Sequence, residues 1–149
     1  MRFNRILAGK GESIMIRRVQ YYETDMMGVT HHANYIRWME EARVEFMDRI
    51  GFPYKRMEEE GVLCVVKSLQ GDYLKPCTFG DDVDIGIEVT GFNGLVVTLA
   101  YEMKVNGVQV FSGTSEHVFM TRDGKFARMK KIMPEFCAAM ERLIQRKEQ

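Results

Sequence analysis

The chain has 149 residues, and 21 Lys plus Arg balance 21 Asp plus Glu, so the formal net charge is zero. This balance argues against a nucleic-acid-binding protein, which usually carries a basic excess, and no apolar run approaches the roughly 20 residues of a membrane span. The three cysteines, Cys64, Cys77 and Cys137, form neither a disulfide framework nor a zinc pattern, and they predict reduced, mostly buried thiols in a cytoplasmic protein.

The N-terminal residues have the pattern of a short leader followed by a strand. Residues 1–14 contain Arg2, Arg5 and Lys10 but no continuous apolar core, so they differ from a secretory signal. We interpret residues 1–14 as a leader segment and residues 15–149 as one domain. A strand is predicted from Ile14 to Tyr22, because this stretch is rich in β-branched and aromatic residues.

From about His32 the apolar period changes to that of a helix. Apolar side chains recur every three or four residues at Ile36, Met39, Ala42, Phe46 and Ile50. Gly51 occupies the position after the helix end that glycine favours. The spacing also allows two ion pairs along the helix, Arg37 with Glu41 and Glu45 with Arg49. One long helix is therefore predicted.

The rest of the chain is dominated by β patterns between two shorter helices. A short helix is predicted over 54–60 and a C-terminal one over 133–146, with strands over 62–74, 83–90, 95–105 and 108–120. Asn93-Gly94 and Asn106-Gly107 separate the last three strands, and Asn-Gly is typical of type I′ hairpin turns, which need two positive φ angles. The order predicts an α+β fold with a helix on one face of an antiparallel sheet.

The segment 22–35 makes the most specific chemical suggestion. Asp25 follows the first predicted strand and precedes the helix start, where unpaired N–H groups can hold an oxyanion. A carboxylate at this place can attack a carbonyl or activate a water. Asp is also common in turns and caps, and composition by itself favours that reading. His31 and His32 match no standard zinc motif, and the isolated His117 is expected to be structural.

A longer string of residues resembles one family. It reads Tyr22-Glu23-Thr24-Asp25-x-x-Gly28-Val29-x-x-His32-Ala33-Asn34-Tyr35, then Glu40-x-Ala42-Arg43, Tyr73-Leu74-x-Pro76 and Gly80-Asp81. This string resembles the hotdog-fold acyl-CoA thioesterases of the 4-hydroxybenzoyl-CoA and Tol-Pal-associated type. The resemblance implies a five-stranded antiparallel sheet wrapped around the long helix. It also implies a homodimer joined edge to edge, often paired into a tetramer, with the active site at the dimer interface and no metal or cofactor.

The resemblance also implies roles for individual residues. Asp25 matches the catalytic acid, and the backbone N–H of His32, with Ala33 beside it, matches the donor that polarises the thioester carbonyl. The His32 side chain is a second catalytic candidate, as a group that orients water, contacts the acyl group or acts as an acid; its alternative role is packing or capping. Glu40 is expected to be structural, and Arg43 is expected to be an ion-pair partner.

Substrate contacts are expected at two places. One is the motif itself, through Tyr22, Gly28, Val29 and Asn34. The other is a basic cluster after the last strand, in which Arg128 and Lys130 are candidates for the phosphates of coenzyme A; a solvated turn is the alternative. The chain departs from many relatives at Glu23, where they have Asp, and at Met26-Met27, where they have smaller residues.

The sequence therefore predicts hydrolysis of acyl-CoA thioesters to free acid and coenzyme A, with Asp25 as nucleophile or general base. Two alternatives stay open at this point. One is a thioesterase for acyl groups on acyl carrier protein, and the other is a non-catalytic hotdog module that binds an acyl ligand or a protein partner. The acyl chain, the choice between anhydride and activated water, and the choice between dimer and tetramer are also open.

Overall fold

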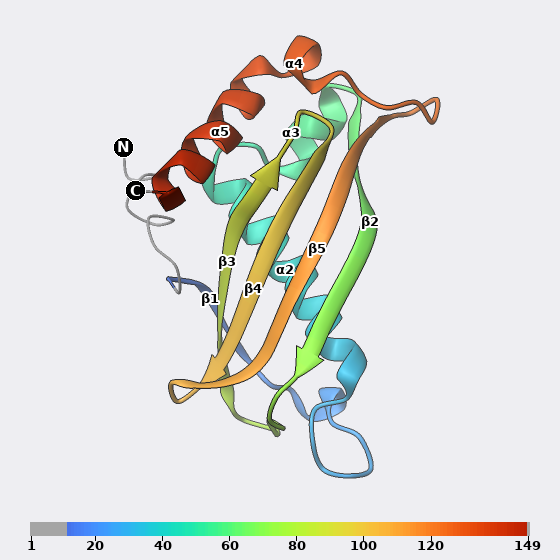
Figure 1. Cartoon of the computed structure of the whole chain (residues 1–149). Helices are drawn as coiled ribbons and strands as arrows, with labels where there is room; N and C mark the ends of the chain where they lie inside the picture. Colours follow the sequence, from blue (N-terminus) through green and yellow to red (C-terminus); the bar gives the residue numbers. More distant parts are fainter. Residues whose placement is uncertain (1–11, 149) are drawn as a thin grey trace.

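The computed structural model describes residues 12–148 (Figure 1). Most of the predicted leader, residues 1–14, lies outside the described residues, and Ser13 and Ile14 already belong to the first strand, β1 (Ser13–Arg18). The strand predicted over 14–22 is therefore too long. The chain turns after β1 because the backbone N–H of Gln20 donates to the Glu23 carboxylate at 2.8 Å, and the 3-10 turn η1 (Tyr21–Glu23) forms there.

The five strands form one antiparallel sheet. The other four are β2 (Val62–Tyr73), β3 (Asp82–Phe92), β4 (Val96–Val105) and β5 (Val108–Thr121). Their order across the sheet is β1-β3-β4-β5-β2, and every pairing is antiparallel. The predicted meander is β3-β4-β5, and among the strands of residues 12–148 β2 forms one edge and pairs with β5 alone.

The two Asn-Gly hairpins form as predicted, but with different turn geometries. Asn106 and Gly107 have φ of 50° and 78°, as a type I′ turn requires. At the other hairpin Gly94 has a φ of 90° and Asn93 does not have a positive φ, so the type I′ prediction is wrong there. The Asn93 side chain instead accepts the N–H groups of Leu95 and Val96 at 2.9 and 2.7 Å, which closes the turn through the side chain.

Helices cover one face of this sheet (Figure 1). The long helix α2 (His32–Arg49) lies along the strands, α3 (Tyr54–Glu59) follows it, and α4 (Met129–Ile132) and α5 (Pro134–Glu148) end the chain. The sequence did not predict α4. The α+β arrangement, with a long helix enclosed by a five-stranded antiparallel sheet and a C-terminal helix, is confirmed.

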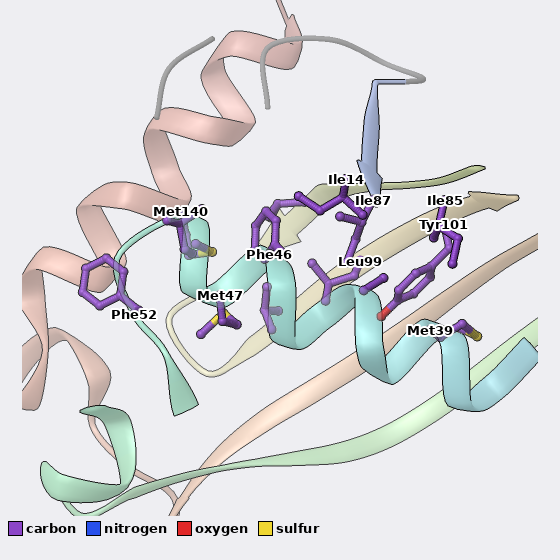
Figure 2. Close-up of a cluster of buried hydrophobic side chains, with 14 of the residues drawn as sticks. Ile14, Met39, Phe46, Met47, Phe52, Ile85, Ile87, Leu99, Tyr101 and Met140 are labelled. Atoms are coloured by element: carbon purple, nitrogen blue, oxygen red, sulfur yellow. The ribbon is translucent and has the colours of Figure 1, made fainter. Parts of the chain in front are cut away.

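The core lies between α2, α5 and the sheet (Figure 2). Met39 and Phe46 of α2 pack with Leu99 and Tyr101 of β4, and all four are at most 5% exposed. Burying a side chain such as Phe46 contributes about 1.5–3 kcal/mol. Ile36, predicted on the same apolar stripe, is 40% exposed, because the buried face of α2 is centred elsewhere. Fully buried side chains on that face are Trp38, Met39 and Ala42.

One of the two predicted helix ion pairs forms. Arg49 contacts Glu45 at 2.8 Å, four residues apart. The predicted pair of Arg37 with Glu41 is wrong, because Glu41 pairs with Arg17 of β1 at 3.2 Å. A tertiary contact has therefore replaced a local one.

Candidate active site

Asp25 lies in a tight turn between η1 and α2. Its N–H donates to the Val29 carbonyl at 2.9 Å, and its own carbonyl accepts the N–H of Gly28 at 3.0 Å. Its Oδ1 accepts the N–H of Met27 at 2.8 Å, which is the turn-capping role expected of Asp. Within residues 12–148, Oδ2 makes no hydrogen bond. One oxygen thus shapes the turn and the other is available for chemistry.

The first residues of α2 present main-chain donors beside this turn. His31 caps the helix, and its Nδ1 accepts the N–H of Ala33 at 3.1 Å. The Asn34 N–H donates to the His31 carbonyl at 3.0 Å. In the part of the chain that the structure describes, the His32 N–H has no acceptor. Of the two predicted oxyanion donors, Ala33 is therefore engaged and His32 is available.

An open hollow brings several predicted residues together. Asp25, Tyr22, Ala33 and Asn34 all line it, with Tyr21, Thr24, Met26, His31 and Arg37. Tyr22 is 76% exposed, so its ring is accessible to a ligand. Asn34 is buried, and its side-chain amide donates to the Glu23 carbonyl at 2.7 Å, so it also supports the turn.

The other predicted contacts lie outside this hollow. Gly28 and Val29 form the returning half of the Asp25 turn, where Gly28 has a φ of 78° that an L side chain rarely adopts. The His32 ring is exposed and stacks on His31 with ring centroids 4.2 Å apart. Its carbonyl accepts the Tyr73 hydroxyl at 2.9 Å.

Arg128 and Lys130 are far from the Asp25 turn in the same chain. Arg128 directly precedes α4 and Lys130 lies within it, and both side chains are exposed. Figure 1 shows α4 at the opposite end of the sheet from the loop that leads into α2. One chain therefore does not bring these cations and Asp25 to one substrate.

Cys77 and Thr78, which the sequence did not single out as site residues, bind the Asp25 turn. The Thr30 N–H donates to the Cys77 carbonyl at 2.8 Å, and the Thr78 hydroxyl donates to the Gly28 carbonyl at 2.7 Å. The Cys77 sulfur lies 3.2 Å from both the Thr30 and Tyr35 hydroxyls. Burial raises the pKa of Tyr35 well above its usual 10. No local pattern could reveal these contacts, since the partners are more than 40 residues apart.

A second polar cluster is buried between α2 and the sheet. Arg43 donates to the Tyr101 hydroxyl at 3.2 Å, which shares a 2.6 Å hydrogen bond with Ser115, and Ser115 lies 2.7 Å from His117 Nε2. Burial, and then the charge of Arg43, lower the pKa of His117 to about 4. No carboxylate of the described residues lies within ion-pair distance of Arg43, so its predicted ion pair is wrong. Burial raises the pKa of the Cys64 thiol to about 11, which makes it a poor nucleophile.

Over residues 12–148 no group of three or more His, Cys, Asp or Glu side chains is placed to hold a metal ion. In the same range, none of the helices combines the length and apolar character that crossing a membrane requires.

A long helix enclosed by a five-stranded antiparallel sheet, with a carboxylate at the helix N-terminus, defines a hotdog protein of the thioesterase type. Residues 19–140 match the family described as the Thioesterase-like superfamily, and the chain belongs to it. The resemblance to the hotdog-fold acyl-CoA thioesterases is thereby confirmed, and with it the assignment of the chain to the thioesterase enzymes. The Tol-Pal-associated subtype stays a prediction.

Individual relatives agree with this family. YneP of Bacillus subtilis (strain 168) is 32% identical over 126 residues, which are 83% of this chain and 91% of YneP. The acyl-CoA thioesterase YbgC of Helicobacter pylori (strain ATCC 700392 / 26695) is 34% identical over 86 residues, 58% of this chain and 62% of that protein. The solved structure of a DHNA-CoA thioesterase from Staphylococcus aureus superposes with a TM-score of 0.83 at 28% identity and covers 86% of this chain and 87% of its own.

Proposed function

We propose that this protein hydrolyses acyl-CoA thioesters to a free acid and coenzyme A, with Asp25 as nucleophile or general base. The observation that carries the proposal is that Asp25 lines an open hollow at the N-terminus of α2 and keeps Oδ2 available. The relatives named as acyl-CoA thioesterases support the choice of substrate class.

Either of two routes balances at this site. Oδ2 can attack the thioester carbonyl and expel the coenzyme A thiolate, which takes a proton, and water then cleaves the acyl–Asp25 anhydride. Alternatively Oδ2 takes a proton from a water that attacks the carbonyl directly. Both routes place negative charge on the carbonyl oxygen, and the unengaged His32 N–H at the positive end of α2 stabilises it. One such donor contributes about 10²–10³ in rate.

Other residues of the motif have supporting roles in this proposal. The exposed Tyr22 ring contacts the acyl group, and Gly28 and Val29 hold the turn that presents Asp25. The His32 ring is placed to orient water or to protonate the leaving thiolate. Ala33 N–H joins the oxyanion site only if the His31 ring turns away from it.

A second copy of the chain would bring Arg128 and Lys130 to the substrate. The edge strand β2 carries exposed Val65, Val66 and Leu69, and one of its sides pairs with no strand of residues 12–148. Such a side is a template for pairing with another strand. Antiparallel pairing of two β2 edges reverses one sheet relative to the other. The α4 end of one copy then lies beside the Asp25 end of its partner, which would bring both cations into range of coenzyme A phosphates.

The catalytic proposal is tested by following coenzyme A release from short, long and aromatic acyl-CoAs and from matched acyl-carrier-protein thioesters. Asp25→Asn should lower kcat by at least about 10³-fold while the circular dichroism spectrum is kept. The matched control is Asp48→Asn, an exposed position on the last turn of α2, which should retain wild-type activity. An active Asp25→Asn enzyme would contradict the mechanism, and wild-type binding without cleavage would favour the non-catalytic alternative.

The assembly proposal has its own measurement. Val66→Lys should shift the species seen by light scattering to the monomer and lower activity, because a charged side chain on an edge strand disfavours pairing with another strand. Val108→Lys, at the exposed β4–β5 hairpin, should leave the assembly unchanged. A wild-type chain that is monomeric at assay concentration would refute the assembly proposal.

A further inference from the structure

Glu23, two residues before Asp25, is a buried carboxylate with four side-chain hydrogen bonds. It is only 3% exposed. Its Oε1 accepts the Gln20 N–H at 2.8 Å and Arg17 Nη1 at 3.1 Å. Its Oε2 accepts the indole N–H of Trp38 at 2.8 Å and Arg17 Nη2 at 3.1 Å. The bidentate arginine compensates the buried charge, and the carboxylate ties together β1, η1 and α2.

The main chain of Glu23 adds two bonds to the start of α2. Its carbonyl accepts the His31 N–H at 2.8 Å and the Asn34 side-chain amide at 2.7 Å. The residue two before Asp25 is therefore bonded to the residue one before His32. Any movement of Glu23 changes how the Asp25 carboxylate lies relative to the His32 N–H.

We propose that Glu23 is a positioning residue for catalysis, which fixes the Asp25 turn against the helix start through its buried contacts with Arg17 and Trp38. The inference rests on the proposed function and extends it to a group that does not touch the substrate. Its physical reason is that small displacements between a nucleophile and an oxyanion donor cost much rate, about 10²-fold for 1 Å.

The hydrogen-bond pattern makes Glu23→Gln an informative substitution. Each carboxylate oxygen accepts from two donors, so the amide NH₂ of glutamine faces two donors in either orientation. The side chain keeps its size but cannot satisfy this site. It must move, and the turn that ends at Glu23 moves with it.

The experiment compares Glu23→Gln with Glu41→Gln. Glu41 is a second carboxylate bound to Arg17, at 3.2 Å, but its side chain is 43% exposed, and within residues 12–148 it makes no hydrogen bond or ion pair to the Asp25 turn. In Glu23→Gln we expect kcat to fall about 10- to 100-fold, with KM changed by less than about threefold. Amide hydrogen exchange in residues 24–34 should become about tenfold faster. Glu41→Gln should match the wild type in all three measurements.

If Glu23→Gln does not fold, Trp38→Phe serves instead, because it removes the indole donor and keeps the pair of Glu23 with Arg17, although it also leaves a cavity beside the buried ring. A folded Glu23→Gln, or Trp38→Phe in its place, with wild-type kcat would overturn the inference. So would a lower kcat with unchanged exchange in residues 24–34, since the residue would then act by another route. If the wild-type chain cleaves no thioester, the proposed function fails by itself. The exchange comparison then decides the positioning role, which faster exchange supports and unchanged exchange overturns.

Discussion

His117 makes the stability of the fold depend on pH. Its side chain is 1% exposed on β5, and burial together with the charge of Arg43 lowers its pKa from 6.5 to about 4. Between these two values the ring is neutral in the folded chain and protonated in the unfolded chain. The unfolded state therefore binds more protons in this window, so the free energy of unfolding falls as the pH is lowered from 6.5 towards 4.

The size of this effect follows from the two pKa values. Well below pH 4, the difference between the two pKa values lowers the free energy of unfolding by about 3 kcal/mol. Between pH 7 and pH 5 this free energy falls by about 2 kcal/mol. Other titratable groups around His117 do not oppose it in this range. Burial keeps Tyr54 of α3, Cys64 of β2 and Tyr101 of β4 neutral by raising the pKa of each.

Urea unfolding at pH 5, 6 and 7 measures the effect, with His117→Gln as the comparison at the same protein concentration. Glutamine can still bond to Ser115 but does not titrate, so this variant should lose about 2 kcal/mol less than the wild type between pH 7 and pH 5. Equal pH slopes for the two proteins would refute the reasoning.

Three further predictions use the same urea assay. Arg43→Met should raise the pKa of His117 and reduce the pH slope without abolishing it, because burial is the larger cause; an unchanged slope would contradict this. Gly71→Ala should cost about 1–3 kcal/mol, since its Cβ would meet the buried Phe111 ring at 2.5 and 2.8 Å. Gly91→Ala, where the nearest atoms are 3.7 and 3.8 Å away, should change stability by less than about 0.5 kcal/mol, and equal effects of the two would refute the argument. Phe46→Ala should cost about 3–5 kcal/mol, and a loss below about 1 kcal/mol would show that the core there is not closely packed.

Local patterns were sufficient for most of the fold. The period of apolar residues placed α2 within one residue of its observed ends, and alternation with Asn106-Gly107 placed the β4–β5 hairpin. These features depend on contacts a few residues apart, which the sequence displays directly. The β1 strand was predicted too long because a side-chain contact, Glu23 with the Gln20 N–H, ends the extended chain earlier than composition suggests.

Around the candidate site the sequence predicted a catalytic carboxylate and a helix start, but it did not predict the contacts that hold them in place. Asp25 and the helix start were recognisable because they are neighbours in one motif. The sequence also placed Arg128 and Lys130 with the substrate, and the structure separates them from Asp25 within one chain. The sequence did not indicate that Glu23 would make many hydrogen bonds in the turn, because its partners come from a strand, a turn and a helix.

The sequence by itself determined the long helix, the meander and a carboxylate at a helix start, because each is encoded in short-range periodicity or in a contiguous motif. Only the tertiary structure decided which donors stay available, which charges are buried and how the Asp25 turn is held. Those properties depend on hydrogen bonds between residues far apart in the sequence, such as Thr30 with Cys77 and Glu23 with Trp38. Burial and hydrogen-bond partners at such contacts depend on the whole packed chain and have no local signature.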